Sequence, residues 1–425
     1  MNEKNIQGDR AAMVASIVLL TIMAIPVNAQ DSSSVSSSTI NLKQILDIVE
    51  QKNPEILAAK RNWEAKRKRT VQAATPDKIK LDIERMYAPL DQNVSGGAQE
   101  KSFLITQEIP FPTTLYLRHS FASKEAAMAG EAYRAKARET RSRARTAYAM
   151  LYLTDRQLEI FKENIELMRR FAKVAESKYA AGHVIQSDAL KAQVELTKML
   201  SMEIMLFQEK QVAQAMINAL MGRPANSPLG TPDDPEPRKL DAKFEDMQTL
   251  AFSERPELKK AFFAYQKAST SLSLARSEYL PDLMLGYRRR NDPMKGNSHD
   301  AILGLSLPLW FWKPAAMTQE AKAEKEMAAA ELESMQVATD AELRIAWIRA
   351  ETTQRLAEIY RTSVLPQAQA ALKIAEAGYQ ANKSNFLDLL DAQRTLLNFR
   401  LEYYRYLADY EERLAELERI VGKEL

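Results

Sequence analysis

Few side chains in this sequence are of the types that carry out covalent chemistry or hold a metal. There is no cysteine among the 425 residues, which excludes disulfides, thiolate metal sites, a cysteine nucleophile and lipid attachment at cysteine. The histidines are His119, His183 and His299, far apart in the sequence, which leaves little for a zinc site or a catalytic triad. No dinucleotide-binding, P-loop or zinc-protease motif occurs. The sequence therefore predicts no enzyme, no catalytic residues, no cofactor and no resident metal site.

One methionine spacing raises a metal-binding hypothesis. Met199, Met202 and Met205 lie three residues apart, and thioethers suit soft copper ions. Packing along a helix seam explains the same spacing, because methionine readily fills irregular gaps between helices. The charge balance, with 59 basic against 56 acidic residues, gives no reason to expect a nucleic-acid partner.

The start of the chain has the pattern of a secretory signal peptide. Lys4 and Arg10 precede an apolar core at 13–25, which is too short for a spanning helix of about 20 residues. We predict a signal peptide at residues 1–29 and a Ser-rich lead-in at 30–39, with the mature chain exported. A short membrane anchor that is never cleaved is the alternative. No later stretch reaches the length and apolarity of a transmembrane helix.

Long intervals without glycine or proline predict unusually long helices. They span 131–181, 183–221, 315–365 and 379–421, far beyond the mean helix of about 11–12 residues. A helix from about Thr113 to Tyr179 would be on the order of 100 Å long. Its second half has a heptad seam, which predicts a coiled-coil-like partner. The seam residues are Ala147, Leu151, Thr154, Leu158, Phe161, Ile165, Met168, Ala172, Ala175 and Tyr179. Pro366, directly after the third interval, lies inside a helical pattern and should bend or interrupt that helix.

The chain also repeats itself. Residues 179–196 align without gaps to residues 379–396, and the shared positions include Asp188 with Asp388. Upstream, Asn53-Pro-Glu matches Arg255-Pro-Glu at an offset of 202. We therefore predict an internal two-fold sequence repeat, although generic similarity between helices is the alternative. The predicted boundaries are 40–221 for the first repeat, 222–240 for a Pro/Asp-rich junction and 241–425 for the second repeat.

Four segments alternate between apolar and polar residues, which is typical of strands with two different faces. Each is about as long as a tilted membrane-spanning strand, although a strand of a soluble sandwich has the same local pattern. The expected strands are 77–87, 100–111, 282–290 and 300–309, with turns at 91–98 and 291–298. Four strands cannot close a barrel and open edges are not tolerated in lipid, so membrane-spanning strands would require several chains to share one barrel. After the last strand, Trp310, Phe311 and Trp312 fit either an aromatic girdle at the membrane interface or core packing.

These features together resemble the TolC-like outer-membrane efflux proteins. The resemblance rests on the paired openings at Asn53 and Arg255, the strand-ending Pro110 and Pro308, and the matched segments 179–196 and 379–396. The segments Leu285-Gly-Tyr-Arg-Arg and Leu303-Gly-Leu-Ser-Leu-Pro-Leu are similar to the heavy-metal and cation efflux (CzcC-like) branch. The resemblance covers about residues 40–421.

The resemblance implies a mainly α fold with a small β part. In a homotrimer, each chain would contribute four strands to one 12-stranded outer-membrane β-barrel, and long helical hairpins would form an α-barrel across the periplasm. A periplasmic adaptor (membrane fusion) protein and an inner-membrane efflux pump would be the partners, with outer-membrane lipid around the strands. The channel would be a passive conduit for substrates, among them metal cations.

The resemblance also implies site residues. An acidic pair near the closed periplasmic tip matches Asp388 and Asp391, whose spacing places both carboxylates on one helix face. Three chains would stack two rings of carboxylates, a constriction that favours cations. An ordinary solvated acidic face is the alternative.

A tyrosine and an aspartate that link neighbouring hairpins match Tyr379 and Asp188. The basic residue expected beside the tyrosine is absent, because its position is occupied by Ser384. Packing along the helix seam is the alternative role for Tyr379.

Two other classes of exported protein remain as alternatives. A periplasmic adaptor would also carry a coiled-coil hairpin, but normally one hairpin in a β-rich chain. A structural coiled-coil protein of an export complex would not explain four strand segments at matched positions.

Overall fold

The computed structural model describes residues 39–87, 99–181, 185–234, 238–240, 243–292, 296–381 and 383–424. The predicted signal peptide and nearly all of the Ser-rich lead-in lie outside these residues. Every helix among the described residues is too short or too polar to cross a bilayer.

Helix α3 (Pro112–Ala180) organises the fold. It has 69 residues and confirms the long helix predicted from about Thr113 to Tyr179. Its first residue is a proline, whose missing N–H is not needed in the first turn of a helix. The predicted seam is buried along most of its length, and among its members only Ala172 and Tyr179 are not. The heptad spacing therefore identified the face of α3 that packs against other helices.

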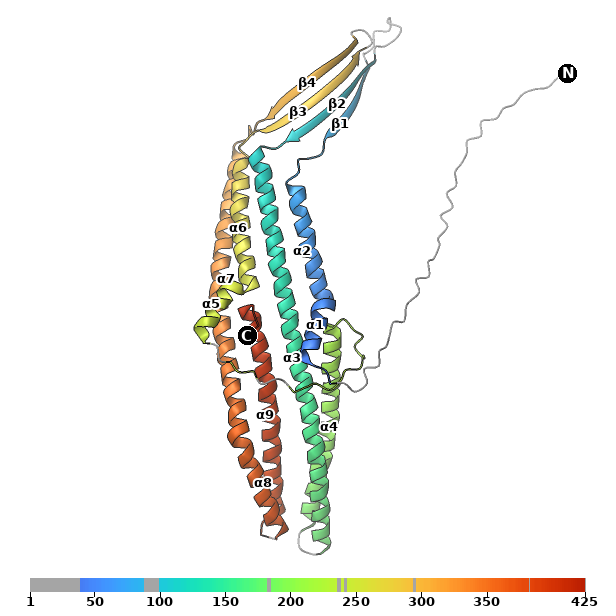
Figure 1. The fold of residues 1–425 in the computed structure, drawn as a ribbon, viewed down its shortest axis with the longest axis vertical. Coiled ribbons are helices and arrows are strands. Elements are labelled where there is room, and N and C mark those ends of the chain that lie inside the picture. Colours follow the sequence, from blue (N-terminus) through green and yellow to red (C-terminus); the bar gives the residue numbers. More distant parts are fainter. Residues whose placement is uncertain are drawn as a thin grey trace, which may run out of the picture. The chain divides into compact units, whose positions relative to one another are not determined.

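Four of the longer helices pack along α3 (Figure 1). Helices α2 (Pro54–Ala73) and α4 (Gln186–Leu220) follow one side of it, and α6 (Pro256–Ser277) and α9 (Phe386–Val421) follow the other. Helix α7 (Trp312–Ile359) packs against both α6 and α9. The two long hairpins are thus α3 with α4, and α7 and α8 (Leu365–Gln380) with α9.

The predicted interruption at Pro366 is confirmed. Between α7 and α8 the backbone forms one π-helical turn, Tyr360–Val364, directly before Leu365 and Pro366. Proline has no N–H to donate to the preceding turn, and a π-turn accommodates the lost bond without ending the helix.

Two short helices open the repeats, and the same contact is found beside each. Helix α1 (Leu42–Lys52) ends where Gly222, at the end of α4, approaches with φ +68; a Cβ there would lie 3.1 Å from the Lys52 carbonyl oxygen. Helix α5 (Phe244–Glu254) ends where Gly422, at the end of α9, approaches with φ +78; a Cβ there would lie 2.7 Å from the Glu254 carbonyl oxygen. Only glycine fits this approach and this backbone conformation without strain.

The residue after each short helix differs between the repeats. Asn53 caps α2, accepting a hydrogen bond from the Glu55 N–H at 2.9 Å and donating to the Leu220 carbonyl at 2.8 Å. Arg255 at the matching place is buried and donates to Thr339 Oγ1 at 3.0 Å on α7. The shared Pro-Glu pattern therefore marks a shared bend, while the preceding residue fixes it differently.

The strands form one antiparallel sheet in the order β1-β2-β3-β4. Their bounds are Lys80–Tyr87, Gln99–Ile109, Asp282–Asp292 and Gly296–Ser306. The prediction of 300–309 for the last strand was wrong at both ends, because β4 begins four residues earlier, at Gly296, and ends three residues earlier, at Ser306. Strands β3 and β4 therefore extend into the expected turn at 291–298. The pairing of Asp292 with Gly296 shows that both strands continue up to residues 293–295, which lie outside the described residues. Gly296 adopts φ +83. The turn expected at 91–98 lies outside the described residues.

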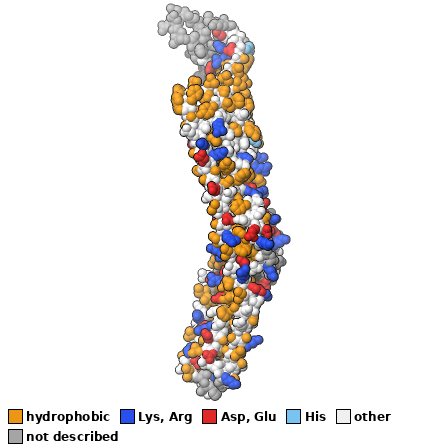
Figure 2. Space-filling model, turned by 90° about the vertical axis from the view of Figure 1, so that its left-hand side faces the viewer, with side chains coloured by type: hydrophobic (Ala, Val, Ile, Leu, Met, Phe, Trp, Pro, Cys, Tyr) orange, Lys and Arg blue, Asp and Glu red, His pale blue; other side chains and the backbone are white. Residues whose placement is uncertain are grey.

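The sheet has an apolar face and a more polar face. The apolar side chains are aligned across neighbouring strands by the register, as in the pairs Leu81 with Ile105 and Leu285 with Leu303. Many of them are exposed within this single chain. Figure 2 shows hydrophobic side chains gathered over the sheet end of the molecule, with charged side chains more frequent further along the helices.

Candidate functional site

The candidate site lies at the ends of the two hairpins, where α3 leads into α4 and α8 leads into α9. All four site residues expected from the sequence, Asp188, Tyr379, Asp388 and Asp391, belong to these ends. One hydrophobic cluster joins the two hairpins, and its members come from α3, α4, α8 and α9. They include Met168, Ala175, Ala192, Tyr379, Phe386 and Leu389. Apolar burial therefore holds the two hairpins of one chain side by side.

Tyr379 is the most deeply placed of the four residues. Its side chain is 3% exposed and its ring lies 5.6 Å from the ring of Phe386, centroid to centroid. Its hydroxyl is buried and has no hydrogen-bond partner among the described residues. Burial, and secondly the charge of Asp188, raise the pKa of Tyr379 above its ordinary value. Tyr179, at the matching position of the first hairpin, is 44% exposed, so seam packing holds for one tyrosine and not for the other.

Asp188 lies in the first turn of α4, where the helix dipole favours a negative charge. Its Oδ1 is 3.6 Å from the Nζ of Lys191. Asp188 is close enough to Tyr379 for its charge to affect the tyrosine pKa, but no hydrogen bond joins the two side chains. The structure thus brings the expected pair into one neighbourhood without a direct link.

Lys178 makes the contact to Tyr379 that the sequence did not indicate. Its Nζ donates to the Tyr379 carbonyl oxygen at 2.6 Å and lies 4.2 Å from the centre of the Tyr379 ring. This ammonium therefore binds one hairpin to the other through both the backbone and the ring. The only signal in the sequence was an asymmetry, because Lys178 aligns with Gly378 in the second hairpin.

The tight hairpin end explains why position 378 is a glycine. Its carbonyl oxygen accepts hydrogen bonds from the N–H groups of Lys383 and Ser384, at 2.8 and 3.2 Å. A Cβ at Gly378 would lie 2.8 Å from Ser384 Oγ. The second tip therefore folds back onto Gly378, and any side chain at this position would require Ser384 to shift.

Asp388 and Asp391 are both exposed on α9, while Leu389 and Leu390 between them are buried. This confirms the shared helix face that their spacing predicted. Asp388 also has a local role that the sequence reasoning missed. Its N–H donates to Asn385 Oδ1 at 2.9 Å, and its Oδ2 accepts from the Asn385 N–H at 3.4 Å. This capping box starts α9, so only Asp391 carries a carboxylate without a part in the helix cap.

Two buried polar side chains also bridge the hairpins. Glu195 of α4, which is buried, accepts a hydrogen bond from Arg394 of α9. Gln393 is also buried, and its Nε2 donates to Asn164 Oδ1 of α3 at 2.8 Å. The equivalent Gln193 instead bonds Glu176 at the surface at 3.2 Å. The repeat predicted a shared glutamine, but only its surroundings decided that one copy would be buried.

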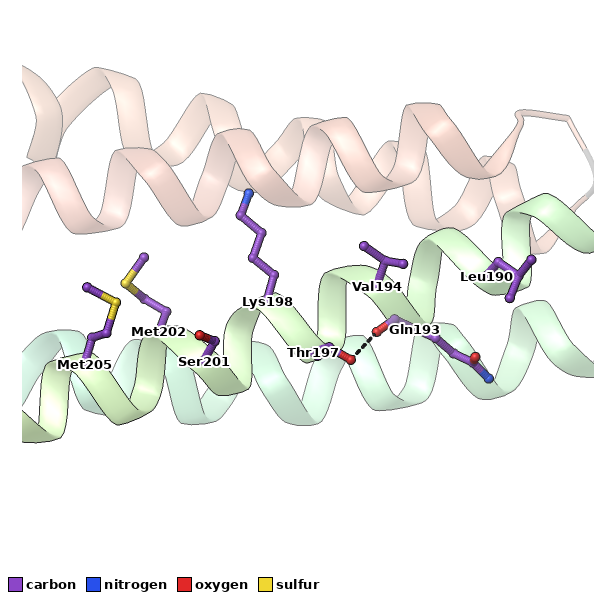
Figure 3. Close-up of a pocket in the computed structure, with 8 residues that line it drawn as sticks. All are labelled: Leu190, Gln193, Val194, Thr197, Lys198, Ser201, Met202 and Met205. Carbon is purple, nitrogen blue, oxygen red and sulfur yellow. Dashed lines mark hydrogen bonds between the residues drawn. The ribbon is translucent and has the colours of Figure 1, made fainter.

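A groove of about 600 Å³ runs along α4 (Figure 3). Its lining comes entirely from that helix: Leu190, Gln193, Val194, Thr197, Lys198, Ser201, Met202 and Met205. Met199 is 2% exposed and turned away from it, whereas Met205 is 54% exposed. The three methionines therefore do not face one side of α4 together. Across the part of the chain that the structure describes, no group of three or more acidic or histidine side chains is placed to hold a metal ion.

Comparison with known families agrees with the arrangement of helices and strands. The family described as outer membrane efflux protein matches residues 45–223 and 249–423. The chain belongs to this family. Both matched segments contain one helical hairpin and one pair of strands.

Individual relatives are distant but cover most of the chain. The cobalt-zinc-cadmium resistance protein CzcC of Cupriavidus metallidurans is 26% identical over 65% of this chain and 66% of its own length. The outer membrane protein TolC of Vibrio cholerae is 24% identical over 90% of each chain. A membrane protein from Pseudomonas aeruginosa has the same fold, with a TM-score of 0.79 at 19% identity over 90% of each chain.

Membership confirms the resemblance inferred from the sequence. The protein is an outer-membrane efflux channel protein that extends into the periplasm. Membership in this family favours the channel over the two alternatives, a periplasmic adaptor and a structural coiled-coil protein. The family consists of channels rather than enzymes.

Proposed function

We propose that three copies of this chain form one continuous channel through the outer membrane and periplasm. The observation that carries the proposal is the sheet: β1 and β4 are edge strands with one partner each. Because the order β1-β2-β3-β4 alternates in direction, β4 of one copy can pair antiparallel with β1 of the next. Three copies then close a barrel of twelve strands and leave no open edge in lipid.

The two faces of the sheet support this closure. One face carries exposed leucine and isoleucine side chains such as Ile83, Leu303 and Leu305, which suit lipid tails. The other face carries Asp82, Arg288 and Asp300 in one row across the sheet, with Leu104 between Asp82 and Arg288, and these charged side chains suit a water-filled lumen. If the polar face met lipid instead, its charged side chains would lose their hydration, which is unfavourable.

The groove on α4 supports the assembly of the helical part. Within one chain α4 packs mainly against α3, so its apolar outer side, including the exposed Val194 and Met205, is not covered by any of the described helices. In a trimer, this side of α4 faces a helical hairpin of the neighbouring copy, and the helices complete an α-barrel. The predicted repeats, 40–221 and 241–425, then each supply one helical hairpin to the wall of the α-barrel.

The channel acts as the outer part of a tripartite efflux system. A periplasmic adaptor joins it to an inner-membrane pump, which supplies the energy. We further propose divalent metal cations as substrates, supported by the similarity to the CzcC resistance protein. Asp391 and Asp388 form stacked carboxylate rings that favour cations at the narrow end, and Tyr379 with Asp188 belongs to the contact between the hairpins that keeps this end closed.

Fractionation and size analysis test the assembly. Cross-linked mature protein is expected in the outer-membrane fraction at the mass of three chains. A soluble monomer would contradict the proposal.

Single-channel recording tests the acidic rings. Asp391→Asn is expected to lower the preference for cations over anions, whereas Asp47→Asn, an exposed aspartate on α1, serves as the matched control and leaves it unchanged. Equal selectivity in both variants would remove Asp391 from the mechanism.

Growth assays test the substrate class. A strain lacking this gene is expected to become sensitive to cobalt, zinc or cadmium salts, with tolerance restored by the wild-type gene. If metal tolerance is unchanged and the strain becomes sensitive to organic compounds, the substrates are organic compounds and not metal cations.

A further inference from the structure

A pocket of about 660 Å³ lies where the two repeats of the chain meet. Its walls come from α1, the first turn of α2, α3, the end of α5, the start of α6 and the residues after α9. Figure 1 shows these segments at about the same height along α3. None of the residues that line this pocket belongs to the hairpin ends or to the sheet, so it is separate from the candidate site described above.

The pocket has an apolar part and more basic than acidic side chains. The apolar part includes Leu46, Val49 and Ile56, each at most 4% exposed. Five basic residues line the pocket against three acidic ones: Arg134, Arg138, Arg141, Lys259 and Lys423 against Glu50, Glu254 and Glu424. The three arginines are spaced by four and three residues along α3, which places them on one side of that helix.

The acidic residues of the pocket are already engaged by two of these basic residues. Glu254 pairs with Lys259 at 2.9 Å. Arg141 pairs with Glu50 at 3.5 Å and also with Glu424. These contacts leave none of the three carboxylates of the pocket free to neutralise another cation.

Two cations of the pocket are left without a counterion. Arg134 pairs with Glu131 at 2.9 Å, whereas Arg138 and Lys423 make no ion pair with a described residue. Arg138 is half-buried, and burial, followed by the charge of Arg141, lowers the pKa of its guanidinium. The Nε of Arg141 is itself buried and has no hydrogen-bond partner among the described residues. Partly dehydrated positive charge without a counterion is unfavourable, so the pocket is suited to an anion.

We propose that this pocket binds a small ligand through an oxyanion group, a phosphate or a carboxylate, held by Arg138, Arg141 and Lys423. A guanidinium presents planar N–H donors that match two oxygens of such a group, and the lysine adds a compact positive charge. The volume falls within the range of roughly 300–1,000 Å³ that is usual for small-molecule sites. The apolar part beside Leu46 and Val49 leaves room for a carbon body attached to the oxyanion.

The ligand would join the two repeats. Arg138 and Arg141 belong to the first repeat and Lys423 to the second, so an anion between them opposes separation of the repeats. The inference goes beyond the proposed channel function, because the described residues of one chain supply every group that it uses.

Equilibrium dialysis of the detergent-solubilised full chain tests the proposal, with radiolabelled inorganic phosphate in one arm and succinate in the other, at constant ionic strength. One saturable site per chain is expected, and the probe that binds more tightly identifies the group as phosphate or carboxylate. Arg138→Gln is expected to weaken binding on the order of 10- to 100-fold. Arg138→Lys keeps the charge without the planar donors and is expected to weaken binding less.

A second variant and a matched control accompany Arg138→Gln. Lys423→Gln changes an exposed residue of the other repeat, so it leaves the fold intact and is also expected to weaken binding. Arg170→Gln changes an exposed arginine of the same helix α3 outside the pocket and is expected to bind as the wild type does. The bound anion should raise the apparent melting temperature of the wild type and not that of Arg138→Gln.

Two results would overturn the proposal. If neither probe binds the wild type at a saturable site, the pocket holds no oxyanion. If Arg138→Gln and Lys423→Gln both bind the probes as tightly as the wild type, the anion binds elsewhere on the chain. Dialysis measures neither conductance nor the number of chains in the assembly, so both results would leave the proposed channel standing.

Discussion

Replacing Tyr379 with phenylalanine is expected to leave the closed hairpins as stable as in the wild type, or more stable. The Tyr379 hydroxyl is buried without a hydrogen-bond partner among the described residues. A buried unsatisfied polar group costs about 1–3 kcal/mol, and the substitution removes that cost. The ring contacts with Phe386 and Lys178 remain, because both use the ring and not the hydroxyl.

Lys178→Met is expected to have the opposite effect. It keeps an apolar stem of similar length but removes the donor at 2.6 Å from the Tyr379 carbonyl and the cation 4.2 Å from the ring centre. A hydrogen bond to a charged group contributes about 1.5–3 kcal/mol and a partly exposed cation–π contact about 0.5–1 kcal/mol. Discounted for partial solvent exposure, the loss is about 1–3 kcal/mol per chain, which corresponds to about a 5- to 150-fold rise in the open-to-closed ratio.

Open probability in planar bilayers measures this ratio directly, and hydrogen exchange at the hairpin ends reports the same opening without a current. Tyr179→Phe is the matched control for Tyr379→Phe, because Tyr179 occupies the same place in the first hairpin but is exposed. Lys173→Met controls for the loss of a lysine on the exposed surface of α3. Both controls are expected to behave as the wild type.

One result would refute this reasoning. If Tyr379→Phe opens the channel as much as Lys178→Met, the tyrosine hydroxyl has a bonding partner in the working assembly, with Asp188 as the nearest acidic candidate. The stabilising contact would then be the tyrosine–aspartate pair expected from the sequence, and not the lysine of the opposite hairpin.

Three further predictions follow from single residues. Asp388→Asn should destabilise the start of α9 by about 0.5–1 kcal/mol, because Asp388 belongs to the capping box, while Asp391→Asn should not; local hydrogen exchange distinguishes them. Gly422→Ala should lower the apparent melting temperature more than Gly296→Ala. Both glycines have positive φ, which costs about 1 kcal/mol for alanine. Of the two, only Gly422 would bring a Cβ against backbone, 2.7 Å from the Glu254 carbonyl oxygen, which adds about 1–3 kcal/mol. Burial and the charge of Asp188 raise the pKa of Tyr379, which means that the closed hairpins favour its neutral form. Below pH about 10 the closed hairpins therefore keep their full stability, and they lose stability as pH rises through the raised pKa. Hairpin opening measured against pH should show this loss in the wild type and not in Tyr379→Phe.

Much of the fold was predictable because it depends on short-range periodicity. The heptad spacing from Ala147 to Ala175 identified the buried side of α3 before any partner was known, and the alternation in residues 282–290 identified a strand with two faces. The end of β4 was misplaced because Leu307 and Leu309 continue the apolar alternation after the hydrogen bonding between the strands has ended at Ser306. A side-chain pattern does not show where backbone pairing stops.

The candidate site was predictable only in part. The family resemblance implied Tyr379, Asp188, Asp388 and Asp391 as residues near the helix ends, and the spacing of the last two predicted their shared face. It could not indicate Lys178, whose contact with Tyr379 joins residues 201 positions apart in the sequence.

The sequence by itself determined the lengths of the helices, the alternation of the strands and the family, because each of these is written in local spacing or in matched segments. Only the tertiary structure decided which of two matched tyrosines is buried, which of two matched glutamines bridges the hairpins, and that the aromatic residues after β4 face outward. The physical reason is the same in each case: burial and hydrogen bonding depend on what the opposite hairpin or the neighbouring element presents, and two equal sequence positions meet different partners once the chain has folded.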